Sequence, residues 1–225
     1  MEPNIISNLN KKADLIRKMC IECIAHFGVG HIGGSSSIIE LLTALYFKCA
    51  NVNPKEPHNP DRDRIVLSKG HAAPALYSTL AAKGYFDKQL LLTLNQNGTT
   101  LPSHADMLKV TGVDFTAGSL GQGISAAVGM AICGKMDRKK FHTYAIVGDG
   151  ESQEGQVWEA LMLAGSRKLN NFTVIVDNNK MQIDGMTADV CKVEPFESKL
   201  KAFGFKTYSI DGHDMESIVD TIEKC

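Results

Sequence analysis

The chain has 225 residues, a formal net charge of −1 and 44% hydrophobic residues, which suffices for one domain with a sizeable core. Its lysines and arginines are dispersed, so we expect no nucleic acid partner. No apolar run approaches the roughly 20 residues that a membrane span needs, and the N-terminus lacks the pattern of a secretory signal. Six scattered cysteines are typical of a reducing cytoplasm, where we place the protein.

The N-terminal segment is predicted to be helical. Residues 8–27 form an amphipathic pattern that ends at Gly28, and residues 37–40 (Ser-Ile-Ile-Glu) have the form of a capping box that opens a second helix. Cys20 and Cys23 lie inside the first helix without a second pair of ligands nearby. We therefore interpret them as small buried hydrophobic residues rather than as a zinc or redox site.

The middle of the chain alternates short apolar runs with helical patterns. A strand is predicted at residues 65–67, and a helix from 72 to 83 that ends at Gly84. The weakly patterned residues 95–118 form a loop whose length is typical of a functional segment or of disorder. A helix rich in small residues follows at 124–133.

The next segment has the pattern of one strand–helix–strand unit. Residues 144–147 and 172–176 are apolar runs of the length of buried parallel strands, and residues 154–168 carry apolar side chains at helical spacing. The first strand ends in Gly-Asp-Gly (148–150) and the second in Asp-Asn-Asn (177–179). Because both strands of a right-handed βαβ unit run the same way, both polar turns should emerge at one edge of the sheet.

These two turns carry the residues of a metal–diphosphate site. Asp149 offers a carboxylate and Asn179 a neutral amide oxygen, and hard oxygen ligands of low total charge suit a Mg²⁺ ion that also binds phosphates. Gly148 and Gly150 allow close approach of the phosphates to the backbone. Each turn alone is more often merely a turn, but the pair at consecutive strand ends favours a functional site.

The alternation continues with helical patterns at 196–203 and from Met215, and a strand predicted at 205–210 between them. The fold class is therefore α/β, with a mostly parallel sheet flanked by helices on both faces. A further strand is expected after the last helix, and the sequence contains none.

Three histidines lie in loops marked by glycine or proline: His31 in Gly-His-Ile-Gly-Gly, His71 in Leu-Ser-Lys-Gly-His-Ala, and His104 in Pro-Ser-His. Imidazoles can bind hydroxyl groups and move protons near neutral pH. Each alone is more often a solvated or locally hydrogen-bonded side chain. The glycines of residues 117–123 can expose main-chain N–H groups to a ligand, or pack their helix tightly on the sheet.

Residues 148–160 and 177–185 resemble the thiamine diphosphate motif of transketolase. Four further segments resemble that family in the same order: those of His31, His71 and His104, and Gly-Ser-Leu-Gly-Gln-Gly at 118–123. The resemblance covers nearly the whole chain. It implies the thiamine diphosphate-binding fold, and ketol transfer from a ketose phosphate to an aldose phosphate, as in the pentose phosphate pathway.

The resemblance also implies roles for single residues. Mg²⁺, for which Ca²⁺ or Mn²⁺ can substitute, would be bound by Asp149, Asn179 and the main-chain carbonyl of Met181. Thiamine diphosphate would contact the remaining positions of the motif, which are Gly148, Gly150 and Ile183.

Beyond the motif itself, His31 and His104 would contact the sugar and assist its proton transfers, and His71 would contact the diphosphate. Gly118 and Leu120 would line the aminopyrimidine ring of the cofactor. Glu154 resembles a family glutamate at the subunit interface that supports the partner's contacts to the cofactor.

The pyrimidine-binding domain of the family, with its activating glutamate, is absent from residues 1–225. We therefore expect a C-terminal transketolase subunit as partner, in a heterotetramer of two two-chain units, with activity only in that complex. Two alternatives stay open. One is membership of another thiamine diphosphate enzyme, of the 2-oxo acid dehydrogenase or deoxyxylulose-phosphate synthase type; the other is a non-catalytic truncated homologue or fragment.

Overall fold

A parallel three-stranded sheet forms the centre of the molecule in this computed structural model, which describes residues 3–225. The strands are β1 (Arg64–Leu67), β2 (Thr143–Gly148) and β3 (Phe172–Asp177), in the order β1-β2-β3. Gly148 pairs with Asp177, so β2 and β3 end side by side. Both parallel pairings agree with the predicted βαβ arrangement.

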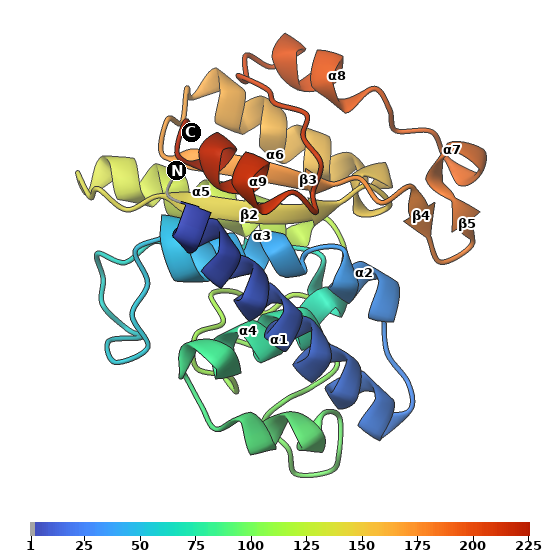
Figure 1. The fold of residues 1–225 in the computed structure, drawn as a ribbon. Helices are drawn as coiled ribbons and strands as arrows, with labels where there is room; N and C mark the ends of the chain where they lie inside the picture. The colour runs from blue at the N-terminus through green and yellow to red at the C-terminus, as the bar shows by residue number, and fades with distance from the viewer. Residues whose placement is uncertain (1–2) are drawn as a thin grey trace.

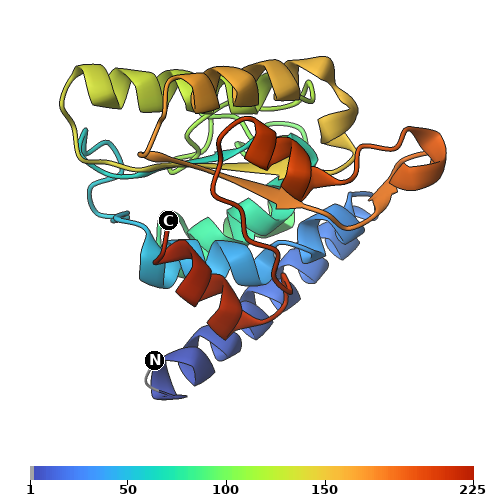
Figure 2. The same ribbon diagram turned by 90° about the horizontal axis from the view of Figure 1, so that it is seen from above.

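Helices cover both faces of the sheet (Figures 1 and 2). On one face a hydrophobic core joins the sheet to α1 (Pro3–Phe27), α3 (Ile39–Ala44), α4 (Ala73–Lys83) and α9 (Met215–Ile222). On the other face a second core joins it to α5 (Gln122–Met136) and α6 (Gly155–Ser166), and α8 (Phe196–Ala202) packs outside α6. The predicted α/β class is confirmed.

Successive side chains of the buried strands feed these two cores in turn. In β2, Tyr144 and Ile146 belong to the core of α1, α3 and α4, whereas Ala145 and Val147 belong to the core of α5 and α6. Since side chains alternate across a strand, a strand buried on both faces must be apolar throughout. This explains the continuous apolar run in the sequence.

Short elements connect these layers. They are α2 (Ile32–Ser36), a π-helical turn (Leu45–Cys49), 3₁₀ turns (Gly70–Ala72, Lys88–Thr93 and Glu151–Gln153), the strands β4 (Met181–Gln182) and β5 (Gly185–Met186) of an antiparallel hairpin, and α7 (Thr187–Val190). No helix or strand lies between residues 95 and 118, as predicted. Cys20 and Cys23 are buried in α1, also as predicted.

Two local predictions are wrong. Ser37 does not cap a helix, because α3 begins after Ile38 and no side chain caps it; the Ser37 hydroxyl instead donates to Asp177 and lies 3.2 Å from the carbonyl of Gly34. Residues 205–210 are not a strand but an unpaired connection that leads from α8 to α9. A segment with strand propensity forms a strand only where it can hydrogen-bond to a neighbouring strand. Within the described chain no strand pairs with this segment.

Among residues 3–225, no helix combines the length and apolar character needed to cross a membrane.

Candidate functional site

The end of β2 and the end of β3 bring the two predicted polar turns together, as expected. Asp149, which follows β2, is only 1% exposed. One of its carboxylate oxygens accepts from the Gly150 N–H (2.9 Å), and the other accepts from the Lys180 N–H (2.7 Å), which belongs to the turn after β3. Burial raises the pKa of Asp149 above its usual value. A nearby cation would stabilise the ionised form of this buried carboxylate.

Asn179 is exposed and has a defined amide orientation. Its Nδ2 group donates to the Asp177 carboxylate at 3.0 Å, and its Oδ1 atom accepts from the Met181 N–H at 3.0 Å. An amide oxygen carries two lone pairs, so Oδ1 keeps one for another partner. This turn therefore presents a neutral oxygen one residue before Lys180, whose N–H binds the Asp149 carboxylate.

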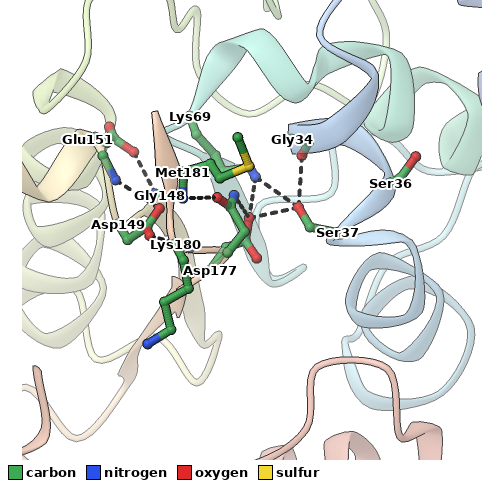
Figure 3. A network of polar contacts seen from close by, with 12 residues as sticks. Gly34, Ser36, Ser37, Lys69, Gly148, Asp149, Glu151, Asp177, Lys180 and Met181 are labelled. Carbon is green, nitrogen blue, oxygen red and sulfur yellow. Dashed lines mark hydrogen bonds and ion pairs between the residues drawn. The ribbon is translucent and has the colours of Figure 1, made fainter. Parts of the chain in front are cut away.

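A buried lysine, which sequence reasoning did not find, underlies this edge of the sheet. The Lys69 side chain is 1% exposed, and its Nζ atom lies 2.6 Å from the Asp177 carboxylate. The Ser37 hydroxyl donates to the same carboxylate oxygen at 2.8 Å (Figure 3). The network links the end of β1 and the connection between α2 and α3 to the end of β3.

Glu151 is a second residue that sequence reasoning did not find. It is 2% exposed, and its carboxylate accepts from the Ser68 hydroxyl (2.5 Å), the Gly121 N–H (2.9 Å) and the Gly148 N–H (3.1 Å). These donors belong to the Leu-Ser-Lys-Gly-His, Gly-Ser-Leu-Gly-Gln-Gly and Gly-Asp-Gly segments. One buried carboxylate thus joins three of the motif loops by hydrogen bonds. Burial raises the pKa of this carboxylate.

The three predicted histidines form one cluster. The ring centroid of His31 lies 5.1 Å from that of His71 and 6.2 Å from that of His104. Burial, followed by the nearby Lys69 ammonium, lowers the pKa of His71 to about 4, and partial burial lowers the pKa of His104. His71 is therefore a neutral imidazole at pH 7.

Gly34 connects the cluster with the buried lysine. A Cβ atom at this position would lie 3.0 Å from the His71 Nε2 atom and 3.7 Å from the Lys69 Nζ atom. Because Lys69 binds Asp177, which in turn binds Asn179, the imidazoles and the polar turns form one continuous site.

The loop that carries Gly118 lies against the segment of His71. A Cβ atom on Gly70 would sit only 2.6 Å from the main-chain oxygen of Ala117, so the two loops touch through glycine. Gly118 has no neighbouring atom within 4 Å of a would-be Cβ atom, and Leu120 is half-buried. The predicted contacts of these two residues with a cofactor ring stay predictions.

The remaining predicted residues lie at the rim. Glu154 is exposed beside Gly121, immediately before α6. Met181 and Ile183 are exposed on the β4–β5 hairpin, Ile183 to 89%. Their roles toward a cofactor and a partner are not tested by these contacts and stay predictions.

The donor set fits a hard divalent cation. Asp149 supplies an anionic oxygen, Asn179 a neutral one, and the main-chain carbonyl of Met181 lies close to the Gly-Asp-Gly turn. A Cβ atom on Gly150 would lie 3.7 Å from that carbonyl oxygen and 2.8 Å from the Gln182 Cβ atom, so only glycine permits this approach. One carboxylate and two neutral oxygens neutralise only part of the charge of a divalent cation, and phosphate oxygens can neutralise the rest. Mg²⁺ is commonly bound in this way, by one or two carboxylates and the phosphates of a ligand.

Comparisons with known proteins agree with this geometry. The family described as "Transketolase, thiamine diphosphate binding domain" matches residues 9–225. The chain is 54% identical over 217 residues to the SqwG subunit of the 6-deoxy-6-sulfo-D-fructose transketolase of Clostridium sp. (strain MSTE9), covering 96% of this chain and 79% of that protein. It is 39% identical over 216 residues to one of the subunits of the apulose-4-phosphate transketolase of Phocaeicola vulgatus, covering 96% of this chain and 76% of that protein.

The fold is also that of solved transketolases. The transketolase of Campylobacter jejuni superposes with a TM-score of 0.90 at 32% identity, over 100% of this chain and 36% of that one. The chain thus spans about a third of the length of such a transketolase and more than three quarters of the two subunits named above. It belongs to the transketolase family, where it matches the thiamine diphosphate binding domain and is similar to proteins named as transketolase subunits.

Proposed function

We propose that this chain binds Mg²⁺ and thiamine diphosphate and, together with a partner subunit, transfers a two-carbon unit from a ketose to an aldose phosphate. The observation that carries the proposal is the continuity of the site. The cluster of His31, His71 and His104 adjoins the sheet edge that presents Asp149 and Asn179. Sugar-binding imidazoles and a metal–diphosphate site next to each other are what ketol transfer requires.

The cofactor and the three histidines would have different roles in this reaction. Thiamine diphosphate, when bound, supplies an electron sink that allows the bond next to the ketose carbonyl to break. His31 and His104 bind the sugar hydroxyls and accept or return their protons. His71, whose pKa burial lowers to about 4 in the unliganded chain, would hold the diphosphate by a hydrogen bond from its ring N–H.

The metal is proposed to rest on Asp149, Asn179 and the carbonyl of Met181. Gly148 and Gly150 would face the diphosphate, Gly118 and Leu120 the aminopyrimidine ring, and Ile183 the apolar side of the cofactor. Ca²⁺ or Mn²⁺, which also take oxygen ligands, should substitute for Mg²⁺.

The partner is proposed to be a second chain that carries the pyrimidine-binding domain and its activating glutamate. The two relatives described above are named as subunits, which supports a two-chain enzyme with residues 1–225 as the diphosphate-binding domain. Glu154 is exposed beside Gly121, which supports a proposed role in contacting that chain, and we propose a heterotetramer of two such units. All six cysteines are free, which favours a reducing compartment such as the cytoplasm.

The donor is proposed to be a ketose with an anionic group at its far end. The relative at 54% identity is named for 6-deoxy-6-sulfo-D-fructose and the one at 39% for apulose 4-phosphate. A sulfonate and a phosphate are both tetrahedral anions, so one kind of binding site accommodates either. The carbonyl end of the ketose would be bound by the same residues of this chain in both cases.

A donor panel tests this function. The reconstituted two-chain enzyme is given fructose 6-phosphate, xylulose 5-phosphate, 6-deoxy-6-sulfofructose or pyruvate, with an aldose phosphate acceptor, and products are followed by mass spectrometry. We expect a two-carbon transfer from at least one ketose and none from pyruvate. Release of CO₂ from pyruvate without ketol transfer would instead identify another thiamine diphosphate activity.

A substitution tests the metal assignment. Asp149→Ala should abolish Mg²⁺-dependent retention of thiamine diphosphate, because the set loses its only carboxylate. Calorimetric titration of the complex measures retention, and Asp184→Ala, an exposed carboxylate on the neighbouring hairpin, is the matched control. Unchanged retention in Asp149→Ala would refute the metal site.

A further inference from the structure

Asp177 lies at the junction of the buried network and the proposed metal site. Its Oδ2 atom accepts hydrogen bonds from three groups: the Lys69 ammonium at 2.6 Å, the Ser37 hydroxyl at 2.8 Å and the Asn179 amide at 3.0 Å. Resting on the function proposed above, we propose that Asp177, anchored by Lys69, is a positioning residue that orients the Asn179 oxygen toward the metal.

The anchor is rigid because its charges are buried. The side chains of Lys69 and Asp177 are 1% and 11% exposed, and a buried charge is retained only when it is paired and hydrogen-bonded. Lys69 follows β1 and Ser37 lies between α2 and α3, so two separate elements fix the position of one carboxylate oxygen. The Asp177 carboxylate is therefore held by buried groups from outside the exposed turn after β3.

The hydrogen bond to this fixed oxygen sets the orientation of the Asn179 amide group. Its Nδ2 group can donate to Asp177 only when Oδ1 points to the opposite side, because the two atoms share one planar group. Oδ1 then accepts from the Met181 N–H at 3.0 Å and keeps a lone pair for a cation. In the flipped orientation the amide would present N–H groups to the cation, which repel it.

A double-substitution cycle tests the inference. Mn²⁺ is titrated, by paramagnetic resonance, into the two-chain complex with thiamine diphosphate, using the unaltered chain, Asp177→Ala, Asn179→Ala and both together. If Asp177 acts through Asn179, its removal weakens Mn²⁺ binding by about 10–100-fold in the unaltered chain. The same removal should change binding by less than about twofold when Asn179 is already alanine.

The matched control is Asp61→Ala, which breaks an exposed ion pair with Lys139 of similar length, 2.7 Å, and should leave Mn²⁺ affinity unchanged. If Asp177→Ala does not fold because it strands the Lys69 charge, the cycle is run in the Lys69→Met background. An equal loss with and without Asn179 would overturn the inference and make Asp177 purely structural, as would no loss at all. Absence of Mn²⁺ binding by the unaltered complex would instead refute the proposed function, and the inference with it.

Discussion

The histidines of the site differ in how strongly the protein encloses them. His71 is the most enclosed, and burial together with the Lys69 ammonium lowers its pKa to about 4. His104 is more open, and its pKa is also lowered, chiefly by partial burial. Under the proposed function, a neutral His71 would leave the proton transfers of the sugar to the more accessible rings of His31 and His104.

This arrangement predicts an acid sensitivity of the unliganded chain. An unfolded histidine has a pKa of about 6.5, so between pH 6.5 and 4 the unfolded state binds a proton that folded His71 does not. Stability from this residue is therefore present above pH 6.5 and is lost as the pH falls toward 4. Replacing His71 by glutamine should reduce the loss of unfolding free energy between pH 7 and pH 5 by about 1 kcal/mol, with solvent screening allowed for.

Urea unfolding at the two pH values measures this difference. His58→Gln, at an exposed histidine outside the site, is the control variant. Because Asp149 and Glu151 have raised pKa values and act in the opposite direction, only the difference between variants is diagnostic. An identical pH dependence in His71→Gln would contradict the assignment of a lowered pKa.

Single residues also show where sequence reasoning reaches and where it stops. The clustering of His31, His71 and His104 could be predicted because their three segments resemble those of one family in the same order, whereas the glycine or proline context of each histidine alone did not favour a shared site. Lys69, Asp177 and Glu151 could not, since charged residues are usually on the surface and their roles arise from partners up to 140 positions away in the chain. Lys69 stands beside His71 in a recognised segment, and that proximity was the one available signal.

At the scale of elements, close packing of α5 on the sheet holds the motif loops in place. A Cβ atom on Gly123 would lie 2.7 Å from the Ser68 Cα atom, so the helix meets the end of β1 without a side chain between them. The Ser68 hydroxyl accepts from the Ile124 N–H and donates to Glu151. Helix packing and loop geometry are therefore coupled.

Two glycines of the same helix test this coupling. Gly123→Ala should destabilise the chain by about 1–3 kcal/mol, because backbone atoms must move to admit the methyl group. Gly129→Ala, where a Cβ atom meets nothing within 4 Å, should stabilise it by about 0.5–1 kcal/mol through helix propensity. Urea unfolding compares the two, and equal effects of both substitutions would argue against tight packing at Gly123.

Elements were predictable wherever local pattern and tertiary context agree. The runs that became β1 and β2 are buried on both faces, and α4 ends at Gly84 in the left-handed conformation that glycine favours. Residues 205–210 have strand propensity, but no strand of the described chain lies beside them. The prediction for Ser37 was wrong because its hydroxyl bonds a carboxylate 140 positions away instead of capping its own helix.

At the scale of the whole molecule, the site lies on one edge of the sheet and is built by loops from both helical layers. The fold could be predicted because the motifs resemble those of a family whose solved members share it, with a TM-score of 0.90. The proposed division of the active site between two chains rests instead on the subunits to which this chain is similar. Under the proposed function, residues 3–225 would present the metal and diphosphate half of such a site.

The most direct test of this account is a titration with the partner. A fixed concentration of the chain, with Mg²⁺, thiamine diphosphate, a ketose donor and an aldose phosphate acceptor, receives increasing amounts of the partner subunit while ketol transfer is followed. The account predicts no turnover without the partner, a linear rise to a plateau at one partner per chain, and no turnover with Asp149→Ala. Turnover by the chain alone, or a saturated complex that holds the cofactor yet transfers nothing from any ketose, would contradict it.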